Sequence, residues 1–366
     1  MIVRATVTPL RVAVVGAGAI AEAAHLPAVA AQAGGLTTVA VVDVDLTRAR
    51  GLADRWRIPA AYSDVEAMLA AERPDLVLVC TPPAAHRSAV VSCLDAGAWV
   101  WCEKPPALSL AEYDEMASHE RDGGPYVAYV FQQRCGSAAR RLRRHITDGT
   151  LGTFRVGLCQ TLWHRGEAYY AVPWRGRWAT EGGGPTMGHG IHQMGLLLWL
   201  LGDWTEVRAT MGTLQHAIET EDVSMAMVRF ANGAMVSVVN SVLSPRETSY
   251  LRFDFTDATV ELTHLYGYDN SNWTWTPAAH RAADPAVGSW PPDREGGSGH
   301  TAGLAALVAS LRAGERPAAR GPDGRRVLEF IAGLYRSAIT DTTVQPGDLV
   351  PADPFYHSMN GDGPSG

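Results

Sequence analysis

A single lysine, Lys104, stands among the 31 lysine and arginine residues of this 366-residue chain. A lysine ammonium can lose its proton when its surroundings lower its pKa, whereas an arginine guanidinium cannot. Lys104 lies in the sequence Glu103-Lys104-Pro105, directly after an expected strand, at the edge where open parallel sheets bind ligands. We therefore expect an acid/base group that holds a substrate hydroxyl and takes or relays its proton. The alternatives are chance retention and a strand-end lysine paired with Glu103.

A glycine-rich turn, Gly16 to Ala21 (GAGAIA), follows the first expected strand and opens an expected helix. Gly16 allows a tight turn, Gly18 lets the backbone approach a pyrophosphate, and Ala21 permits close packing of helix on strand. Ala19 and Ile20 lie at the helix start, where free N–H groups and the positive end of the helix dipole attract phosphate. The turn predicts a dinucleotide site.

Asp43 ends the second expected strand, 22 residues after Ala21. A carboxylate at this place accepts hydrogen bonds from both ribose hydroxyls and repels a 2′-phosphate. NAD is therefore the expected cofactor, with NADP as the alternative. A helix N-cap is the other interpretation of Asp43.

The elements that must position these residues change character along the chain. Strands alternate with helices up to about residue 131, which predicts a Rossmann domain with a parallel sheet. The expected strands are 11–15, 38–42, 75–80, 98–102 and 125–131, and the expected helices are 19–33, 46–57, 65–71, 86–96 and 110–120. Six strands then follow one another in an α/β domain with an open, mostly antiparallel sheet, whose free face suits a second subunit. They are 153–163, 206–214, 222–230, 234–243, 250–256 and 259–266.

This pattern predicts three segments: a dinucleotide-binding domain at 1–133, a substrate and oligomerisation domain at 134–345, and a weakly ordered tail at 346–366. A loop is expected at 277–299, and helices are expected at 303–313 and 325–340. Two domains also suit the length of the chain.

Composition narrows the class of protein. The net charge of −7 gives no global attraction to nucleic acid or to an anionic membrane, and the arginines at 140–144 are expected on a solvated helix face. No apolar run reaches the ~20 residues that span a bilayer, and the first ten residues do not resemble a signal peptide. Five cysteines without a CxxC pair argue against a disulfide framework or a zinc site. A cytoplasmic protein without nucleic-acid or membrane partners is expected.

Four motifs together resemble the Gfo/Idh/MocA oxidoreductase family over residues 12–340. They are GAGAIA at 16–21, TPP at 81–83 with His86 behind it, EKP at 103–105, and GGG at 182–184 followed by GxH at 190–192. The resemblance implies reversible hydride transfer between NAD(P) and a sugar, cyclitol or similar polyol, in a homodimer or homotetramer. It also implies that Lys104 and His192 are catalytic, that Glu103 lies near the nicotinamide ribose, and that Thr81, Pro82 and His86 belong to the cofactor site.

The fourth motif, GGG followed by GxH, departs from the family pattern, because Gly188 and Gly195 replace its two aspartates. The first replacement removes a carboxylate that would orient the substrate or tune the lysine. His189 lies three residues before His192, on the same face of a helix, and is expected to take over part of that role. The two histidines also make a metal site conceivable, but no neighbouring Asp, Glu or Cys completes one, so no metal is expected.

The segment before this motif mixes aromatic residues with arginines, a composition that suits a sugar ring and its hydroxyls. An interface or core loop is an equally good interpretation. The expected substrate-contacting residues are Lys104, Trp163, Tyr170, Trp174, Arg175, Trp178, His189 and His192, with His164, Tyr169 and Arg177 nearby and Gln132, Gln133 and Arg134 as weaker candidates.

Two other functions remain open at this point. One is an enzyme that oxidises a glycoside transiently with bound NAD in order to eliminate a substituent. The other is a binding protein that senses a dinucleotide or sugar without catalysis.

Overall fold

The computed structural model describes residues 8–32, 34–284, 287, 296–317 and 321–362. The chain forms two compact units, each with its own sheet. The first comprises Met1–Pro106, Tyr113–Val130 and His300–Gly321, and the second comprises Ala107–Glu112, Phe131–Gly299 and Pro322–Gly366.

The sheet of the first unit is entirely parallel, as the alternation of strands and helices predicts. Its strand order is β3-β2-β1-β4-β5-β6. The strands are β1 (Leu10–Val15), β2 (Leu36–Val42), β3 (Ala60–Tyr62), β4 (Leu76–Val79), β5 (Trp99–Cys102) and β6 (Val127–Tyr129). β4 and β5 are buried along their whole length, which explains why they read as continuous apolar runs. In this strand order the direction of winding reverses beside β1, where doubly wound folds bind dinucleotides.

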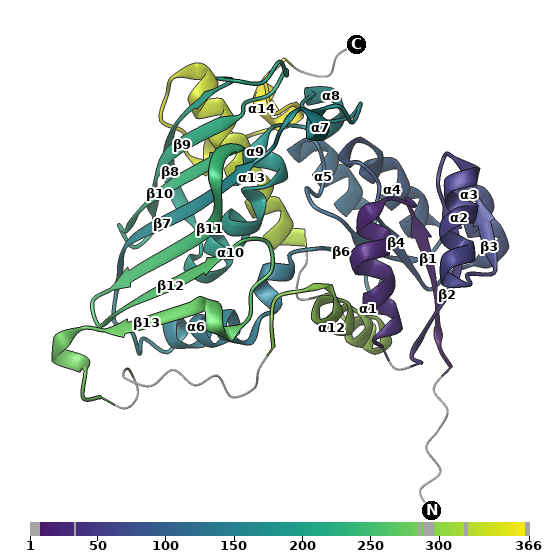
Figure 1. The fold of residues 1–366 in the computed structure, drawn as a ribbon, viewed down its shortest axis with the longest axis horizontal. Coiled ribbons are helices and arrows are strands. Elements are labelled where there is room, and N and C mark those ends of the chain that lie inside the picture. Colours follow the sequence, from purple (N-terminus) through teal and green to yellow (C-terminus); the bar gives the residue numbers. More distant parts are fainter. Residues whose placement is uncertain (1–7, 33, 285–286, 288–295, 318–320, 363–366) are drawn as a thin grey trace, which may run out of the picture. The chain divides into compact units, whose positions relative to one another are not determined.

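Helices cover this sheet on both faces (Figure 1). They are α2 (Leu46–Trp56), α3 (Val65–Glu72), α4 (His86–Asp95) and α5 (Leu110–Ser118), with α1 (Leu26–Ala30) behind a π-helical turn, Ala21–His25. The expected helix at 19–33 is therefore shorter and irregular at its start. β3 was not expected, because its three residues carry too little pattern.

Helix α12 (His300–Ala313) belongs to the first unit, although the expected division places it in the second. Leu304, Leu307 and Val308 of α12 are buried in the same core cluster as residues of β1, β4 and β5. The apolar face of α12 thus completes the cover of the parallel sheet, a contact that local periodicity does not reveal.

The sheet of the second unit has the order β13-β12-β11-β7-β10-β9-β8 and is antiparallel except for the pair β7–β10. Its strands are β7 (Phe154–His164), β8 (Trp204–Gly212), β9 (Val223–Phe230), β10 (Met235–Ser241), β11 (Leu243–Phe255), β12 (Ala258–His264) and β13 (Trp273–Pro277). The open, mostly antiparallel sheet is confirmed, and β13 is an addition to it. Of the expected loop at 277–299, residues 285–286 and 288–295 lie outside the described residues.

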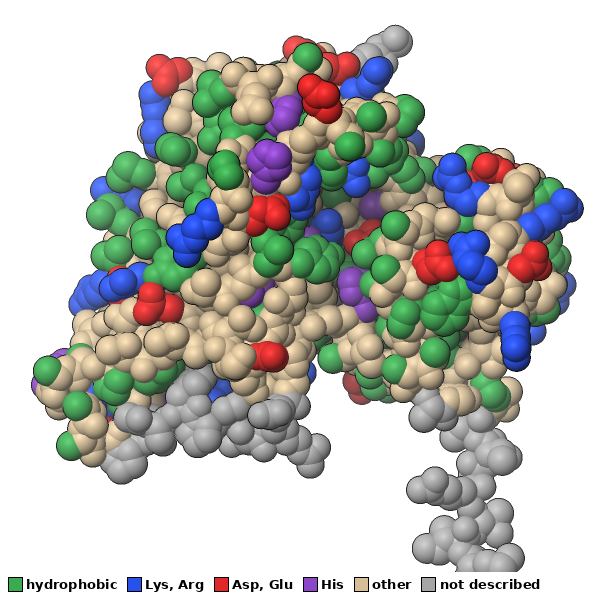
Figure 2. All heavy atoms as spheres, in the orientation of Figure 1, with side chains coloured by type: hydrophobic (Ala, Val, Ile, Leu, Met, Phe, Trp, Pro, Cys, Tyr) green, Lys and Arg blue, Asp and Glu red, His purple; other side chains and the backbone are tan. Residues whose placement is uncertain are grey.

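The helices α6 (Ser137–Thr147), α10 (Ile191–Leu201) and α13 (Gly321–Thr340) lie along one face of this sheet (Figure 1). The other face carries Val156, Met225, Met227 and Met235, which are exposed although apolar. Hydrophobic side chains are interspersed with polar ones over this part of the second unit (Figure 2).

The segment expected to be a weakly ordered tail packs against the second unit as far as the structure describes it. It forms the short helix α14 (Pro354–His357), and Phe355, Tyr356 and Met359 are buried. Asp353 also pairs with Arg336 of α13, with Oδ2 2.9 Å from Nε. Three buried apolar side chains and one ion pair outweigh the turn-forming composition of the segment.

Two surface features bear on the expected partners. Arg140, Arg143 and Arg144 of α6 are exposed, as a solvated helix face requires. Among the described helices, none combines the length and hydropathy needed to cross a bilayer.

Candidate active site

The turn after β1 contains two glycines, Gly16 and Gly18, whose surroundings differ. Gly16 has φ +98°, and a Cβ there would lie 2.8 Å from the backbone carbonyl carbon of Cys80. Both the conformation and the close approach exclude a side chain. A Cβ at Gly18 would meet no atom within 4 Å, so the turn's backbone is open on that side. A tight turn with one open backbone position, followed by a helix start at Ala21, fits a pyrophosphate.

Asp43 ties this turn to the end of β2. Its Oδ2 accepts a hydrogen bond from the Ala17 N–H at 2.9 Å, and its Oδ1 accepts one from the Asp45 N–H at 3.0 Å. The N-cap of α2 is Asp45, which accepts from the N–H groups of Thr47 and Arg48, so capping does not account for Asp43. Each Asp43 oxygen keeps a second lone pair, which fits the two hydroxyls of a ribose.

His86 connects the two loops that follow β4 and β5. Its Nδ1 lies 2.9 Å from the Pro105 carbonyl oxygen, its Nε2 lies 3.0 Å from the Thr81 carbonyl oxygen, and its ring is fully buried. Burial lowers the pKa of His86 below its ordinary value, although the carbonyl contacts oppose that effect. The structure thus places His86 where it holds the TPP and EKP loops together, rather than where its side chain is accessible to a ligand.

Glu103 is buried against two histidines from distant parts of the first unit. Its Oε1 lies 2.8 Å from Nε2 of His25 and 3.1 Å from Nε2 of His300, and its Oε2 accepts from the Lys104 N–H at 3.2 Å. Burial alone would raise the pKa of Glu103, but the hydrogen bonds from His25 and His300 hold it well below the ordinary value. Trp101 packs edge-on against both imidazoles. The carboxylate therefore holds the backbone of Lys104 and has the histidines as side-chain partners.

The three ligand atoms of His25, Glu103 and His300 lie within 4.8 Å of one another and could in principle surround a cation. The observed distances are those of N–H···O hydrogen bonds, and two imidazole N–H groups that donate to one carboxylate oxygen account for them.

Glu103→Gln should lower the free energy of unfolding at pH 7 by about 1.5–3 kcal/mol, the range for hydrogen bonds to a charged group. The reason is that the amide NH₂ of a glutamine would face the Lys104 N–H or the histidine donors, whichever way it is turned. Since the folded state lowers the pKa of Glu103, its charge stabilises the protein above the unfolded pKa of about 4.3, and this contribution is lost as the pH falls through the folded value.

Urea unfolding of parent and variant at pH 7, 5 and 3.5 measures this difference, which should narrow toward acid. Glu22→Gln on the exposed ion pair with Arg55 is the matched control and should change stability little. If the difference in free energy of unfolding between parent and Glu103→Gln widens toward acid pH, Glu103 is not charged in the folded protein.

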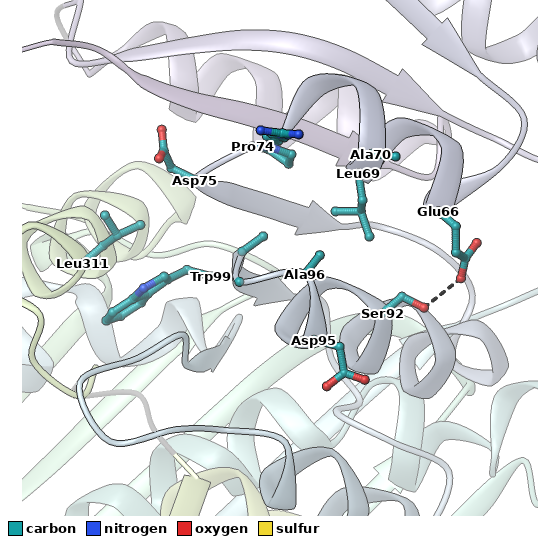
Figure 3. Close-up of a pocket in the computed structure, with 13 residues that line it drawn as sticks. Glu66, Leu69, Ala70, Pro74, Asp75, Ser92, Asp95, Ala96, Trp99 and Leu311 are labelled. Atoms are coloured by element: carbon teal, nitrogen blue, oxygen red, sulfur yellow. Dashed lines mark hydrogen bonds between the residues drawn. The ribbon is translucent and has the colours of Figure 1, made fainter.

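A hollow of about 820 Å³ in the first unit lies at the opposite edge of its sheet, where β4 and β5 begin (Figure 3). Pro74, Asp75, Ala96 and Trp99 line it, and Ser92 donates to Glu66 at its rim (2.8 Å). Ligands of open parallel sheets bind at the carboxyl ends of the strands, so this hollow is not the cofactor site.

In the second unit, the glycines of the GGG motif are packing requirements. A Cβ at Gly183 would lie 2.1 Å from the Tyr335 hydroxyl oxygen, and one at Gly184 would lie 1.9 Å from the Glu221 carbonyl oxygen. The buried Glu221 carboxylate accepts from the N–H groups of Gly184 (3.0 Å) and Thr186 (2.9 Å) at the start of α9 (Pro185–Gly188). This carboxylate, which sequence analysis missed, anchors the helix start that leads to His189.

His189 and His192 meet an aromatic cluster at the junction of α9 and α10. The Trp163 ring centroid lies 5.0 Å from that of His189 and 6.4 Å from that of His192, and Tyr266 packs edge-on against His192 at 5.2 Å. Both histidines are buried. Tyr266 was not expected, because it follows β12 in a turn that lacks a motif.

The expected aromatic and arginine residues separate into two groups. Tyr169 lies 3.3 Å from His189 through its hydroxyl, and the Arg175 guanidinium lies over the rings of Tyr169 and Trp174. Tyr170 packs against Tyr169 and His216.

Trp178 belongs to the other group, because it packs on Tyr335 and donates to the Glu219 carbonyl oxygen. His164 and Arg177 are exposed. Of the weaker candidates, Gln132 and Gln133 bond to Tyr266, and Arg134 pairs with Asp323.

Both domains of the chain match a known protein family. Residues 10–130 match the Gfo/Idh/MocA profile described as an oxidoreductase family with an NAD-binding Rossmann fold, and residues 139–262 match the Gfo/Idh/MocA C-terminal domain. D-glucoside 3-dehydrogenase of Escherichia coli (strain K12) is 29% identical over 365 residues, which cover 93% of this chain and 98% of that protein. D-apiose dehydrogenase of Paraburkholderia graminis is 28% identical over 89% of this chain and 87% of its own length.

Among solved structures, the WlbA dehydrogenase of Chromobacterium violaceum, in complex with NADH and UDP-GlcNAcA, has a TM-score of 0.81 and 26% identity, over 96% of this chain and all of that one. Levoglucosan dehydrogenase, at 20% identity and a TM-score of 0.77, shares the fold. With both of its domains matched, the chain belongs to the Gfo/Idh/MocA family of NAD-binding oxidoreductases.

Proposed function

We propose that this protein is an NAD-dependent dehydrogenase or ketoreductase that transfers a hydride between nicotinamide and a secondary alcohol or ketone of a sugar, cyclitol or similar polyol. The observation that carries the proposal is the cluster of His189, His192 and Arg175 among Trp163, Tyr169 and Tyr266. Imidazole and guanidinium groups bond hydroxyls, and aromatic faces bind the CH groups of a ring. The relatives named for activity on D-glucosides and D-apiose support this substrate class.

NAD supplies the hydride acceptor. The turn at Gly16 and Gly18 would hold its pyrophosphate, and Asp43 its ribose hydroxyls. Oxidation of the alcohol also releases the hydroxyl proton, which Lys104 or His192 accepts and returns when the reaction runs backward. Glu103 and His86 hold the EKP loop and so position Lys104.

A single-turnover absorbance scan with NAD over a panel of sugars, cyclitols and polyols tests the proposal. Formation of free NADH with at least one substrate is expected. Substrate turnover without net NADH would favour transient oxidation and elimination by bound NAD. Binding without turnover on the whole panel would favour a sensing protein.

NAD should raise the melting temperature more than NADP at equal concentration, because Asp43 repels a 2′-phosphate. Tenfold tighter binding adds about 1.4 kcal/mol of stability at saturating ligand. Asp43→Ala should narrow the difference between the melting-temperature shifts with NAD and with NADP. Nη1 of Arg48 lies 3.8 Å from the Asp43 carboxylate, on a side chain that is 60% exposed, and an arginine there can attract a 2′-phosphate. Arg48→Ala should therefore widen the difference. Equal shifts with the two cofactors in the parent would overturn the NAD assignment.

The exposed apolar face of the second sheet supports a homodimer or homotetramer. Met225, Met227, Met235 and Val156 lie on one side of neighbouring strands, with Met235 directly opposite Val156 in the register of β10 and β7. We assign this face to a second copy of the chain, and light scattering of the purified protein measures the mass.

Cytoplasmic location is also part of the proposal, supported by five cysteines that form no disulfide.

A further inference from the structure

A chain of contacts links a buried carboxylate to His189 within the second unit. Glu181 ends α8 (Trp178–Glu181), and its Oε1 lies 3.4 Å from Nη1 of Arg175. The same Nη1 donates to the hydroxyl oxygen of Tyr169, and this hydroxyl lies 3.3 Å from Nε2 of His189. Glu181 is held in turn by the Gly176 N–H, which donates to its Oε2 at 2.6 Å. Glu181 and His189 are both buried, at 4% and 6% exposure.

One arrangement of donors and acceptors connects Glu181, Arg175, Tyr169 and His189 in a single direction. A guanidinium has no acceptor, so the Tyr169 oxygen accepts from Arg175. The one hydrogen of the tyrosine hydroxyl is then free to point at Nε2 of His189. Burial raises the pKa of Tyr169, which keeps that hydrogen in place. In this arrangement Nε2 of His189 is the acceptor, which places a ring proton on Nδ1.

Glu181 also lies next to the position where this chain lacks the motif aspartate. A Cβ built at Gly188 would lie 3.5 Å from Oε1 of Glu181, and outside its chain neighbours and the backbone of its own helix no other atom comes within 4 Å of it. The backbone at Gly188 does not have a positive φ, so the glycine there is not a conformational requirement. A carboxylate from α8 thus stands beside the position from which the aspartate is missing.

We propose that Glu181, Arg175 and Tyr169 form a relay that fixes His189 as the Nδ1–H tautomer, and that this relay replaces the motif aspartate absent at Gly188. In this arrangement His189 presents a hydrogen-bond donor to a substrate oxygen and is not the base. Lys104 and His192 remain the acid/base groups. Glu181, Arg175 and Tyr169 are positioning residues, since they act through His189. The tautomer itself does not depend on the proposed function, whereas its effect on turnover does.

Nitrogen NMR of the ¹⁵N-histidine-labelled full chain tests the tautomer directly, with His189→Gln used to assign the signals. The parent should show a protonated Nδ1 and an unprotonated Nε2 at His189. Tyr169→Phe should shift the ring toward the Nε2–H form, because the donor to Nε2 is gone. Tyr170→Phe is the matched control, since Tyr170 packs on Tyr169 and His216 and should leave the signals of His189 unchanged. A parent with Nε2–H, or a Tyr169→Phe variant with an unchanged tautomer, overturns the relay.

Turnover tests what the relay does. Glu181→Gln and Tyr169→Phe should each lower NADH formation about threefold to tenfold, no more than the loss of His189 itself, because both residues act through His189 by hydrogen bonds. In the Glu181→Gln background, Gly188→Asp should recover much of that loss, because it returns a carboxylate to the same place. In the parent, Gly188→Asp should not raise turnover, because two carboxylates would then crowd one another.

The two proposals fail in different ways. If the Glu181→Gln, Gly188→Asp double variant stays folded but gains nothing over Glu181→Gln, the replacement of the aspartate is wrong. If the NMR result holds while the parent oxidises no polyol, the relay stands and the proposed dehydrogenase function fails.

Discussion

We expect Lys104→Arg to lower turnover by about 10²–10⁴, the usual range for the loss of a general acid/base, and to leave folding and NAD binding close to those of the parent. Arginine keeps the positive charge and most of the length, but it does not release its proton at working pH. The backbone contact from residue 104 to the Glu103 carboxylate does not involve the side chain, so the EKP loop keeps its anchor. Single-turnover NADH formation and the NAD-induced rise in melting temperature measure the two properties separately.

A second variant at the same position separates proton transfer from charge. Lys104→Met removes both and should lose at least as much turnover as Lys104→Arg. Arg50→Lys, an exposed change on α2, is the control for a swap of these two side chains and should leave turnover unchanged. Near-parent turnover in Lys104→Arg would show that the lysine only positions the substrate. This result would favour the alternative function of a sensing protein.

His192→Ala should abolish most of the turnover, by about 10² or more, because His192 is proposed as the second acid/base group. His189→Ala should cost less, about tenfold, since His189 is proposed to bind the substrate as a donor. Both rings pack against Trp163, which lies under the Arg165 guanidinium, and Tyr169 connects His189 to Arg175 and Glu181.

The pH dependence of NADH formation, measured for both variants and the parent, checks this prediction. His189→Ala should move the acid limb of the profile, because neighbouring titratable groups respond as a coupled set. His145→Ala, on α6 against Trp275, is a matched control for the loss of an imidazole and should keep the parent profile. If His189→Ala follows the parent at every pH, His189 is a structural neighbour and the relay has no part in turnover.

Local sequence determined the cofactor half of this protein. The strand, turn and helix at 10–30 are contiguous, and burial on both faces of a parallel sheet produces the continuous apolar runs that predict it. Gly16 could be placed because a positive φ and a close backbone approach are requirements of the turn itself. Asp43 could be placed because the distance along the chain from the turn to the end of the next strand is nearly constant in this fold.

Only the tertiary structure decided which polar groups meet away from those motifs. His25, Glu103 and His300 come together because α12 returns to the parallel sheet, and nothing in the periodicity of 300–313 indicates which sheet it will cover. Trp178 and Trp163 look alike in the sequence, yet one packs on Tyr335 and the other on the two histidines.

The compensation for the missing aspartate also depended on the structure. Glu181 lies seven residues before Gly188, and their proximity follows from how α8 and α9 fold around the GGG turn. Sequence spacing points to His189, because it directly follows Gly188. The carboxylate itself is that of Glu181 in α8, and the placement of α8 is set by long-range packing. Motifs within one turn or strand are governed by local backbone geometry, whereas the partner of a buried polar group is chosen by the packing of the whole unit.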